Sequence, residues 1–117
     1  MKKVDLVKVI TKGIQEKKGT DIVIIDLSKI EGAICSYFVI AQGGSPAQVE
    51  AITESVGDMA RAAGEKPTHV IGLDRCQWVA MDYTDVMVHI FLPELRAYYD
   101  LEHLWDDAKI KNIPNID

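Results

Sequence analysis

The sequence is poor in cysteine and has no long apolar run. Its two cysteines, Cys35 and Cys76, stand far apart and outside any CxxC spacing, so we expect packed, reduced thiols. No stretch approaches the roughly 20 apolar residues that a membrane span needs. Residues 1–5 contain charges but are not followed by the uninterrupted apolar run of a signal peptide. These absences predict a cytoplasmic protein without a membrane anchor.

Positive charge is also scarce. The chain has 13 Lys and Arg against 18 Asp and Glu, a net charge of −5. A protein that grips nucleic acid needs Lys and Arg gathered on one face, and the only dense basic runs here are Lys2-Lys3 and Lys17-Lys18. Direct nucleic-acid binding is therefore disfavoured as the main role. An acidic protein can still join a ribonucleoprotein by docking on one of its basic proteins.

The composition that remains is that of one globular domain. The 117 residues are 48% hydrophobic and 26% charged. A chain of this size and composition can form a hydrophobic core without disulfides or a structural metal. Apolar residues at helical spacing, or in β-branched runs, predict the elements. The expected helices are 4–18, 46–63, 93–98 and 101–105, and the expected strands are 21–27, 37–41, 68–71, 78–83 and 86–91.

This order of elements predicts an α/β (α+β) fold, with a mixed sheet of about five strands flanked by helices. We expect the domain to cover residues 1–108 and residues 109–117 to form a flexible tail.

Local signals mark the helix ends. Ser45 can cap the second helix, Pro46 fits its first position, and Gln48 completes a capping box. Gly19 and Gly64 suit the left-handed positions that end the first two helices.

The runs 78–83 and 86–91 are separated only by Thr84 and Asp85, so they predict a hairpin. Thr84 is an unfavourable turn residue, because tight hairpin turns require a positive φ, which a β-branched residue rarely adopts. Within the second run, alternation places Val86, Val88 and Ile90 on one face and Met87, His89 and Phe91 on the other. His89 is therefore expected to be a hydrogen-bonded core or interface residue.

Catalytic chemistry finds little support. The three histidines have no metal-ligand spacing, and no serine or cysteine lies in a nucleophile motif. The backbone N–H groups of Gly43-Gly44-Ser45 could bind an anion at the start of the helix, but the capping box explains the same residues. A nucleotidyltransferase would need paired carboxylates there to hold two metal ions, and only Asp58 is present. We expect no cofactor, no metal and no enzyme activity; a nucleotidyltransferase-type enzyme is the alternative.

The C-terminal half is rich in residues that dominate protein interfaces. It holds six of the eight aromatic residues, interleaved with aspartate and glutamate. Aromatic anchors within an acidic rim suit a basic protein surface. The alternative, that these aromatics build the core, has equal weight from the residues alone.

The run 78–91, WVAMDYTDVMVHIF, closely resembles the ribosomal silencing factor family, also called RsfS or Iojap. The family's usual form is a Trp, a Leu-rich run, Asp-Tyr-Gly-Asp and a Val-Val-His-Val-Phe strand. Arg96, Tyr98-Tyr99, Asp100-Leu101-Glu102 and Leu104-Trp105 match next, and the runs 21–27 and 37–41 match upstream. The resemblance covers about residues 6–107. Thr84 departs from it, standing where the family usually has Gly.

The resemblance implies a nucleotidyltransferase-like fold without the catalytic carboxylates. It also implies binding to ribosomal protein fourteen of the large subunit, which sterically blocks association with the small subunit and represses translation when nutrients are short. Family members often form homodimers when free, and organellar relatives assist large-subunit assembly, which leaves an assembly adaptor as a further alternative. The residues expected to bind the partner are Trp78, Asp82, Tyr83, Tyr98, Tyr99, Asp100 and Trp105.

Overall fold

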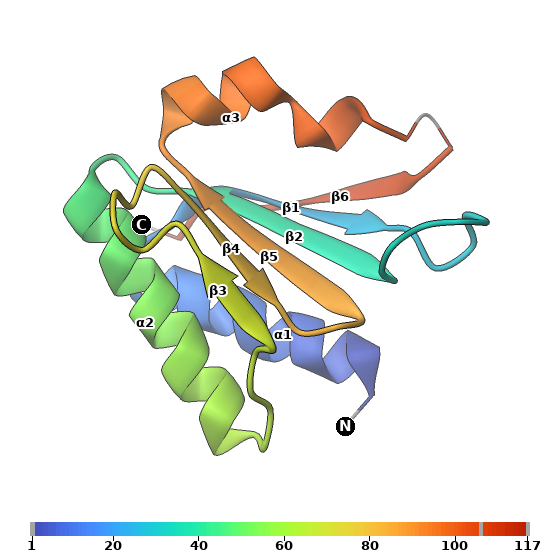
Figure 1. The fold of residues 1–117 in the computed structure, drawn as a ribbon, viewed down its shortest axis with the longest axis horizontal. Coiled ribbons are helices and arrows are strands. Elements are labelled where there is room, and N and C mark those ends of the chain that lie inside the picture. The colour runs from blue at the N-terminus through green and yellow to red at the C-terminus, as the bar shows by residue number, and fades with distance from the viewer. Residues whose placement is uncertain (1, 106, 117) are drawn as a thin grey trace.

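A computed structural model describes residues 2–105 and 107–116, and its centre is a mixed sheet (Figure 1). The sheet has six strands in the order β3-β4-β5-β2-β1-β6. The strands are β1 (Thr20–Asp26), β2 (Tyr37–Gln42), β3 (His69–Ile71), β4 (Trp78–Asp82), β5 (Val86–Phe91) and β6 (Lys109–Ile113). The mixed α/β fold is confirmed, with one strand more than the sequence predicted.

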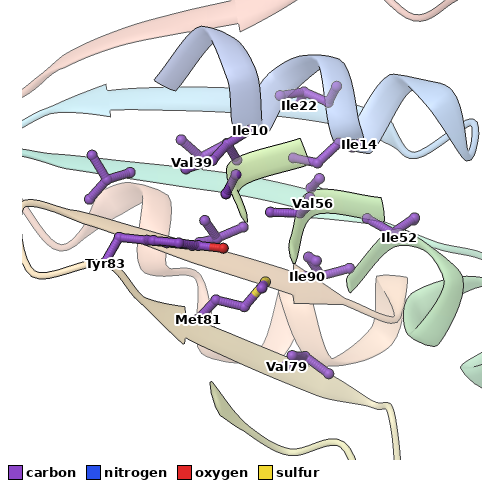
Figure 2. Packing of buried hydrophobic residues seen from close by; sticks show 14 of the residues in the cluster. Ile10, Ile14, Ile22, Val39, Ile52, Val56, Val79, Met81, Tyr83 and Ile90 are labelled. Atoms are coloured by element: carbon purple, nitrogen blue, oxygen red, sulfur yellow. The ribbon is translucent and has the colours of Figure 1, made fainter. Parts of the chain in front are cut away.

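Two helices, α1 (Lys3–Glu16) and α2 (Pro46–Ala62), cover one face of the sheet. Figure 2 shows Ile10 and Ile14 from α1 and Ile52 from α2 lying over the strands. The helices also contact each other directly, because the Ser55 hydroxyl donates to the Gly13 carbonyl oxygen at 2.7 Å. The larger of two core clusters therefore lies between these helices and the sheet.

The start of α2 confirms the expected cap. The Ser45 hydroxyl accepts from the Gln48 backbone N–H at 3.2 Å. The Gln48 side chain accepts from the Gly44 N–H at 2.7 Å instead of from the cap residue itself. It also donates to the carbonyl oxygens of Lys17 and Lys18, each at 3.2 Å. Gln48 thus ties the end of α1 to the start of α2.

The end of α1 differs from the expectation. Lys18, not Gly19, holds the left-handed position, with φ of 60°. Gly19 serves packing instead, because a Cβ there would lie 2.4 Å from a methyl group of Ile14. The expected exit of α2 is confirmed, since Gly64 has φ of 88°.

The β4–β5 hairpin and its alternation are confirmed. The strands pair antiparallel, with Trp78 opposite Phe91 and Ala80 opposite His89. Val86, Val88 and Ile90 belong to the core under α1 and α2. Phe91 belongs to the second core cluster, and Met87 packs against it.

Thr84 takes a positive φ of 72° in the hairpin turn. Asp82 supports this conformation, because its carboxylate accepts from the Thr84 N–H at 2.8 Å.

The expected flexible tail is wrong for Lys109–Ile113, which form β6. This strand pairs antiparallel with β1, Lys111 opposite Ile24 and Ile113 opposite Ile22. The Asn115 side chain also accepts from the Asp21 N–H at 2.9 Å. The polar composition of the segment reflects an edge strand, which needs few buried side chains.

The second face of the sheet is covered by α3 (Pro93–Tyr99) and by a short 3₁₀ turn, η1 (Leu101–His103). Figure 1 shows both on the side opposite α1 and α2. The buried residues of the second cluster are Val23, Ile25, Leu27, Phe38, Ile40 and Phe91. Leu95, Leu101 and Trp105 pack against them.

Candidate partner-binding surface

The two tyrosines of α3 are its most prominent exposed side chains. Pro93 occupies the first helical position, where its missing N–H has no cost. Leu95 packs towards the sheet, which leaves Tyr98 80% and Tyr99 45% exposed. Asp100 then ends the helix in a left-handed conformation, with φ of 46°. A helix of two turns, anchored by Leu95, thus presents two tyrosines to solvent.

Trp78, at the start of β4, links these tyrosines to the sheet. Its ring stacks on Phe91 with centroids 5.0 Å apart and lies 4.7 Å from the ring of Tyr99. Tyr98 meets Tyr99 edge-on at 5.1 Å. We call the surface formed by Trp78, Leu95, Tyr98 and Tyr99 the aromatic surface. Aromatic rings favour such edge-on and stacked contacts, so the rings of this surface support one another.

A hollow of about 230 Å³ opens beside the aromatic surface. Its wall is formed by Gly72, Asp74, Arg75, Gln77, Trp78, Leu95 and Tyr99. The loop between β3 and β4 approaches the sheet closely here: a Cβ on Gly72 would lie 2.0 Å from the Trp78 carbonyl oxygen. A partner side chain could enter this hollow between the loop and the two rings.

Arg96 fixes α3 to the ends of the strands. Its guanidinium donates to the Asp21 carbonyl oxygen at 2.6 Å and to the Gln42 side chain at 3.3 Å. It also forms an ion pair with Glu102 at 2.7 Å, with 10% of the Arg96 side chain exposed. Arg96 therefore ties the helix that carries the tyrosines to β1, to β2 and to η1.

The surroundings of the aromatic surface carry an acidic excess. Asp74 lines the hollow, and Glu94 lies in the first turn of α3. Asp100 contacts the ring of His103 at 2.5 Å and raises the pKa of that histidine through its hydrogen bond and its charge. Arg96 and Glu102 neutralise each other, and Arg75, which also lines the hollow, is the basic residue set against these acids. Such a rim suits a basic partner.

Three other residues predicted to bind a partner lie apart from this surface. Trp105 packs edge-on against Phe38, with centroids 5.1 Å apart, over the second core cluster. Asp82 lies at the opposite end of β4 from Trp78, about 13 Å along the strand, where it holds the Thr84 turn. Tyr83 is only 6% exposed and belongs to the core under α1 and α2 (Figure 2). The structure therefore brings together Trp78, Tyr98, Tyr99 and Asp100.

Sequence reasoning missed Leu95 and the residues 72–77 that form the hollow. Leu95 had no signal beyond its place in an amphipathic turn. The position of Tyr83 could have been found, because residues 78 and 83 of a continuous strand point to opposite faces.

The Gly43-Gly44-Ser45 turn is occupied by its own chain. The Gly43 N–H donates to the Phe91 carbonyl oxygen at 3.0 Å. The Gly44 N–H and the Ser45 hydroxyl are bound to Gln48, as described above. The Gly43 and Gly44 N–H groups and the Ser45 hydroxyl are thus already bonded within the chain.

Both cysteines are free thiols. Burial raises the pKa of Cys35 to about 11, and burial also raises the pKa of Cys76. Because the thiolate is the reactive form, neither is suited to nucleophilic chemistry.

Within residues 2–105 and 107–116, no group of three His, Cys, Asp or Glu side chains is placed to hold a metal ion. In the same part of the chain, no helix combines the length and apolar character needed to cross a membrane.

Comparisons with known proteins agree over nearly the whole chain. A family model described as "Ribosomal silencing factor during starvation" matches residues 1–117. A Bacillus subtilis (strain 168) protein, Ribosomal silencing factor RsfS, is 34% identical over 113 residues, covering 97% of this chain and 95% of the relative. A mouse protein, Mitochondrial assembly of ribosomal large subunit protein 1, is 27% identical over 95 residues, covering 79% of this chain and 41% of the relative. A crystal structure from Chromobacterium violaceum matches with a TM-score of 0.85 at 34% identity, covering 90% of this chain and 87% of that one.

Proposed function

The chain belongs to the ribosomal silencing factor family, and from this premise we propose that it binds the large ribosomal subunit and hinders its association with the small subunit. The proposed contact is ribosomal protein fourteen of the large subunit. Bound there, a body of 36 × 33 × 28 Å would stand between the subunits and repress translation, above all when nutrients are limiting. The role is that of a regulatory binding protein in the cytoplasm, without catalysis.

The aromatic surface is the observation that supports this proposal. Interface hot spots are enriched in Trp and Tyr that are well packed and become desolvated on binding. Tyr98 and Tyr99 are exposed, backed by Trp78, and flanked by a hollow. The acidic rim matches a cationic ribosomal protein and would speed the encounter.

Co-sedimentation with purified large and small subunits tests the proposal. The wild type should travel with large subunits only and should reduce the yield of joined ribosomes. A Tyr99→Ala change should weaken binding by about 2 kcal/mol, roughly 30-fold. Val4→Ala is the matched control, because Val4 is exposed on α1, on the opposite side of the sheet. Protein that ignores large subunits and leaves subunit joining unchanged would sink the proposal.

We further propose that the free chain forms a homodimer. Sedimentation equilibrium with and without large subunits separates this state from the bound one. An adaptor that uses the aromatic surface only for self-association would show dimers that Tyr99→Ala disrupts, without any binding to subunits.

A further inference from the structure

A buried histidine lies directly behind the aromatic surface. His89 is 5% exposed. The centroid of its ring lies 4.9 Å from the ring centroid of Phe38 and 6.1 Å from that of Phe91. Its strand neighbour across the hairpin is Ala80. Because Ala80 is small, the indole of Trp78 can lean over it and reach the histidine diagonally.

The indole is held there by a hydrogen bond. The Trp78 Nε1–H donates to His89 Nδ1 at 3.1 Å. For Nδ1 to accept, it must be unprotonated, so the single ring proton of His89 resides on Nε2. Burial lowers the pKa of His89 to about 4, which keeps this acceptor available at neutral pH.

The other nitrogen of His89, Nε2, has no partner among residues 2–105 and 107–116. This nitrogen is buried, and no donor or acceptor in the described part of the chain is placed to hydrogen-bond with it. A buried polar group without a partner costs free energy that an apolar side chain of similar shape would not. Stability of the core is therefore a poor explanation for a histidine at this position, whereas a role towards Trp78 accounts for it.

The contacts continue from the histidine to solvent. The Trp78 ring packs against the ring of Tyr99, with centroids 4.7 Å apart. Tyr99 in turn packs against Tyr98, with centroids 5.1 Å apart. Without its bond to His89, the indole would keep its ring contacts with Phe91 and Tyr99 but would lose the directional contact that fixes its χ angles. A turn of the indole would move the tyrosines and reshape the hollow that Trp78 lines.

We propose that His89 is a positioning residue: it accepts the Trp78 indole N–H from inside the protein and thereby sets the arrangement of Trp78 and Tyr99 that the partner binds. This inference rests on the proposed function, since it assigns a role at the same surface. His89 touches no partner itself.

Asn and Leu at position 89 form a matched pair for the test. The two side chains have nearly the same shape, but only Asn offers an acceptor close to the place of Nδ1. Binding to large subunits should weaken about 2- to 10-fold more in His89→Leu than in His89→Asn, the range of one net hydrogen bond. In a Trp78→Phe background, which has no indole N–H, the two substitutions should be equivalent.

A spectroscopic readout on the free protein accompanies the affinities. The indole N–H of Trp78 should exchange faster with solvent in His89→Leu than in wild type or His89→Asn. The indole signal of Trp105, the only other tryptophan, serves as the internal reference, and circular dichroism verifies the fold.

The outcomes separate cleanly. Failure of the wild type to bind large subunits overturns the proposed function. In a wild type that binds, equal affinities of the Leu and Asn variants overturn the positioning role alone. A Leu-against-Asn difference that persists in the Trp78→Phe background also overturns it, because the effect then does not pass through the indole.

Discussion

At the scale of single residues, environment decides what each aromatic or polar side chain does. Trp78 and Tyr83 lie five positions apart, yet one supports the aromatic surface and the other fills the core on the opposite face. Tyr98 and Tyr99 are adjacent and both remain exposed, because α3 contacts the sheet through Leu95. The same residue type therefore has a binding or a packing role according to its face.

The buried His89 gives a pH dependence of stability. Its pKa is lowered from 6.5 to about 4 by burial, so between these values the unfolded chain binds a proton that the folded chain does not. The contribution of His89 to stability is then complete above about pH 6.5 and falls as the pH drops towards 4, by on the order of 3 kcal/mol. The exposed His103, whose pKa is raised by Asp100, acts in the opposite direction near neutral pH and is the same in wild type and in His89→Leu.

Urea unfolding between pH 7 and pH 4.5 measures this loss. His89→Leu should flatten the profile in that range. The lowered pKa of Asp26, whose main cause is its hydrogen bond with Ser28, acts only below its ordinary value of 3.8 and stays outside the window. An equally steep profile in His89→Leu would contradict the assignment to this histidine.

Gly72→Ala should destabilise the protein and weaken partner binding. Gly72 has φ of 97°, and its added Cβ would lie 2.0 Å from the Trp78 carbonyl oxygen, so the loop that lines the hollow must move. We expect a loss of about 2–4 kcal/mol in thermal or urea unfolding.

Gly64→Ala is the matched control for this change. Gly64 also has a positive φ, 88°, but a Cβ there meets nothing within 4 Å. It should cost only about 1 kcal/mol of backbone strain. Equal losses in both variants would show that the contact with Trp78 is unimportant.

At the scale of elements, the cap of α2 predicts a measurable loss. Ser45→Ala removes the oxygen that accepts the Gln48 N–H and should cost about 1 kcal/mol of unfolding free energy. Ser45→Asn, which keeps a capping oxygen, should stay near wild type. A destabilised Asn variant would indicate that the hydroxyl has another role.

Elements with a strong local pattern could be predicted from the sequence, and elements that depend on distant partners could not. The helices α1 and α2 and the β4–β5 hairpin carry apolar periodicity and turn signals of their own. The strand β6 has none of these. Lys109–Ile113 become a strand because β1 offers an open edge, and that edge exists only after the sheet has formed.

The candidate site shows the same division. The aromatic richness of the C-terminal half was visible in the sequence, and so was the family resemblance. The grouping of Trp78 with Tyr99 was not, because it depends on how α3 folds back over β4 and β5. Nor was the hollow, since the loop 72–77 that closes it has no recognisable motif.

At the scale of the whole molecule, the net charge of −5 predicts salt-dependent association. Exposed charges attract a basic partner over about 8–10 Å at ordinary ionic strength. Raising the salt concentration should therefore lower the association rate constant more than it raises the dissociation rate constant. Stopped-flow or surface-based kinetics at several salt concentrations would check this, and an association rate that is insensitive to salt would contradict it.

The parallel pairing of β2 with β5 has a consequence for how the protein unfolds. These strands are neighbours in space, yet α2, β3 and β4 separate them along the chain, so their contact requires closure of a long loop. We expect the amides of Val39 and Val88 to exchange with deuterium only on global unfolding. The amides of β3 and β6 should exchange through local fraying. The pairing that joins the two halves of the polypeptide would then be among the last contacts to break under denaturing conditions.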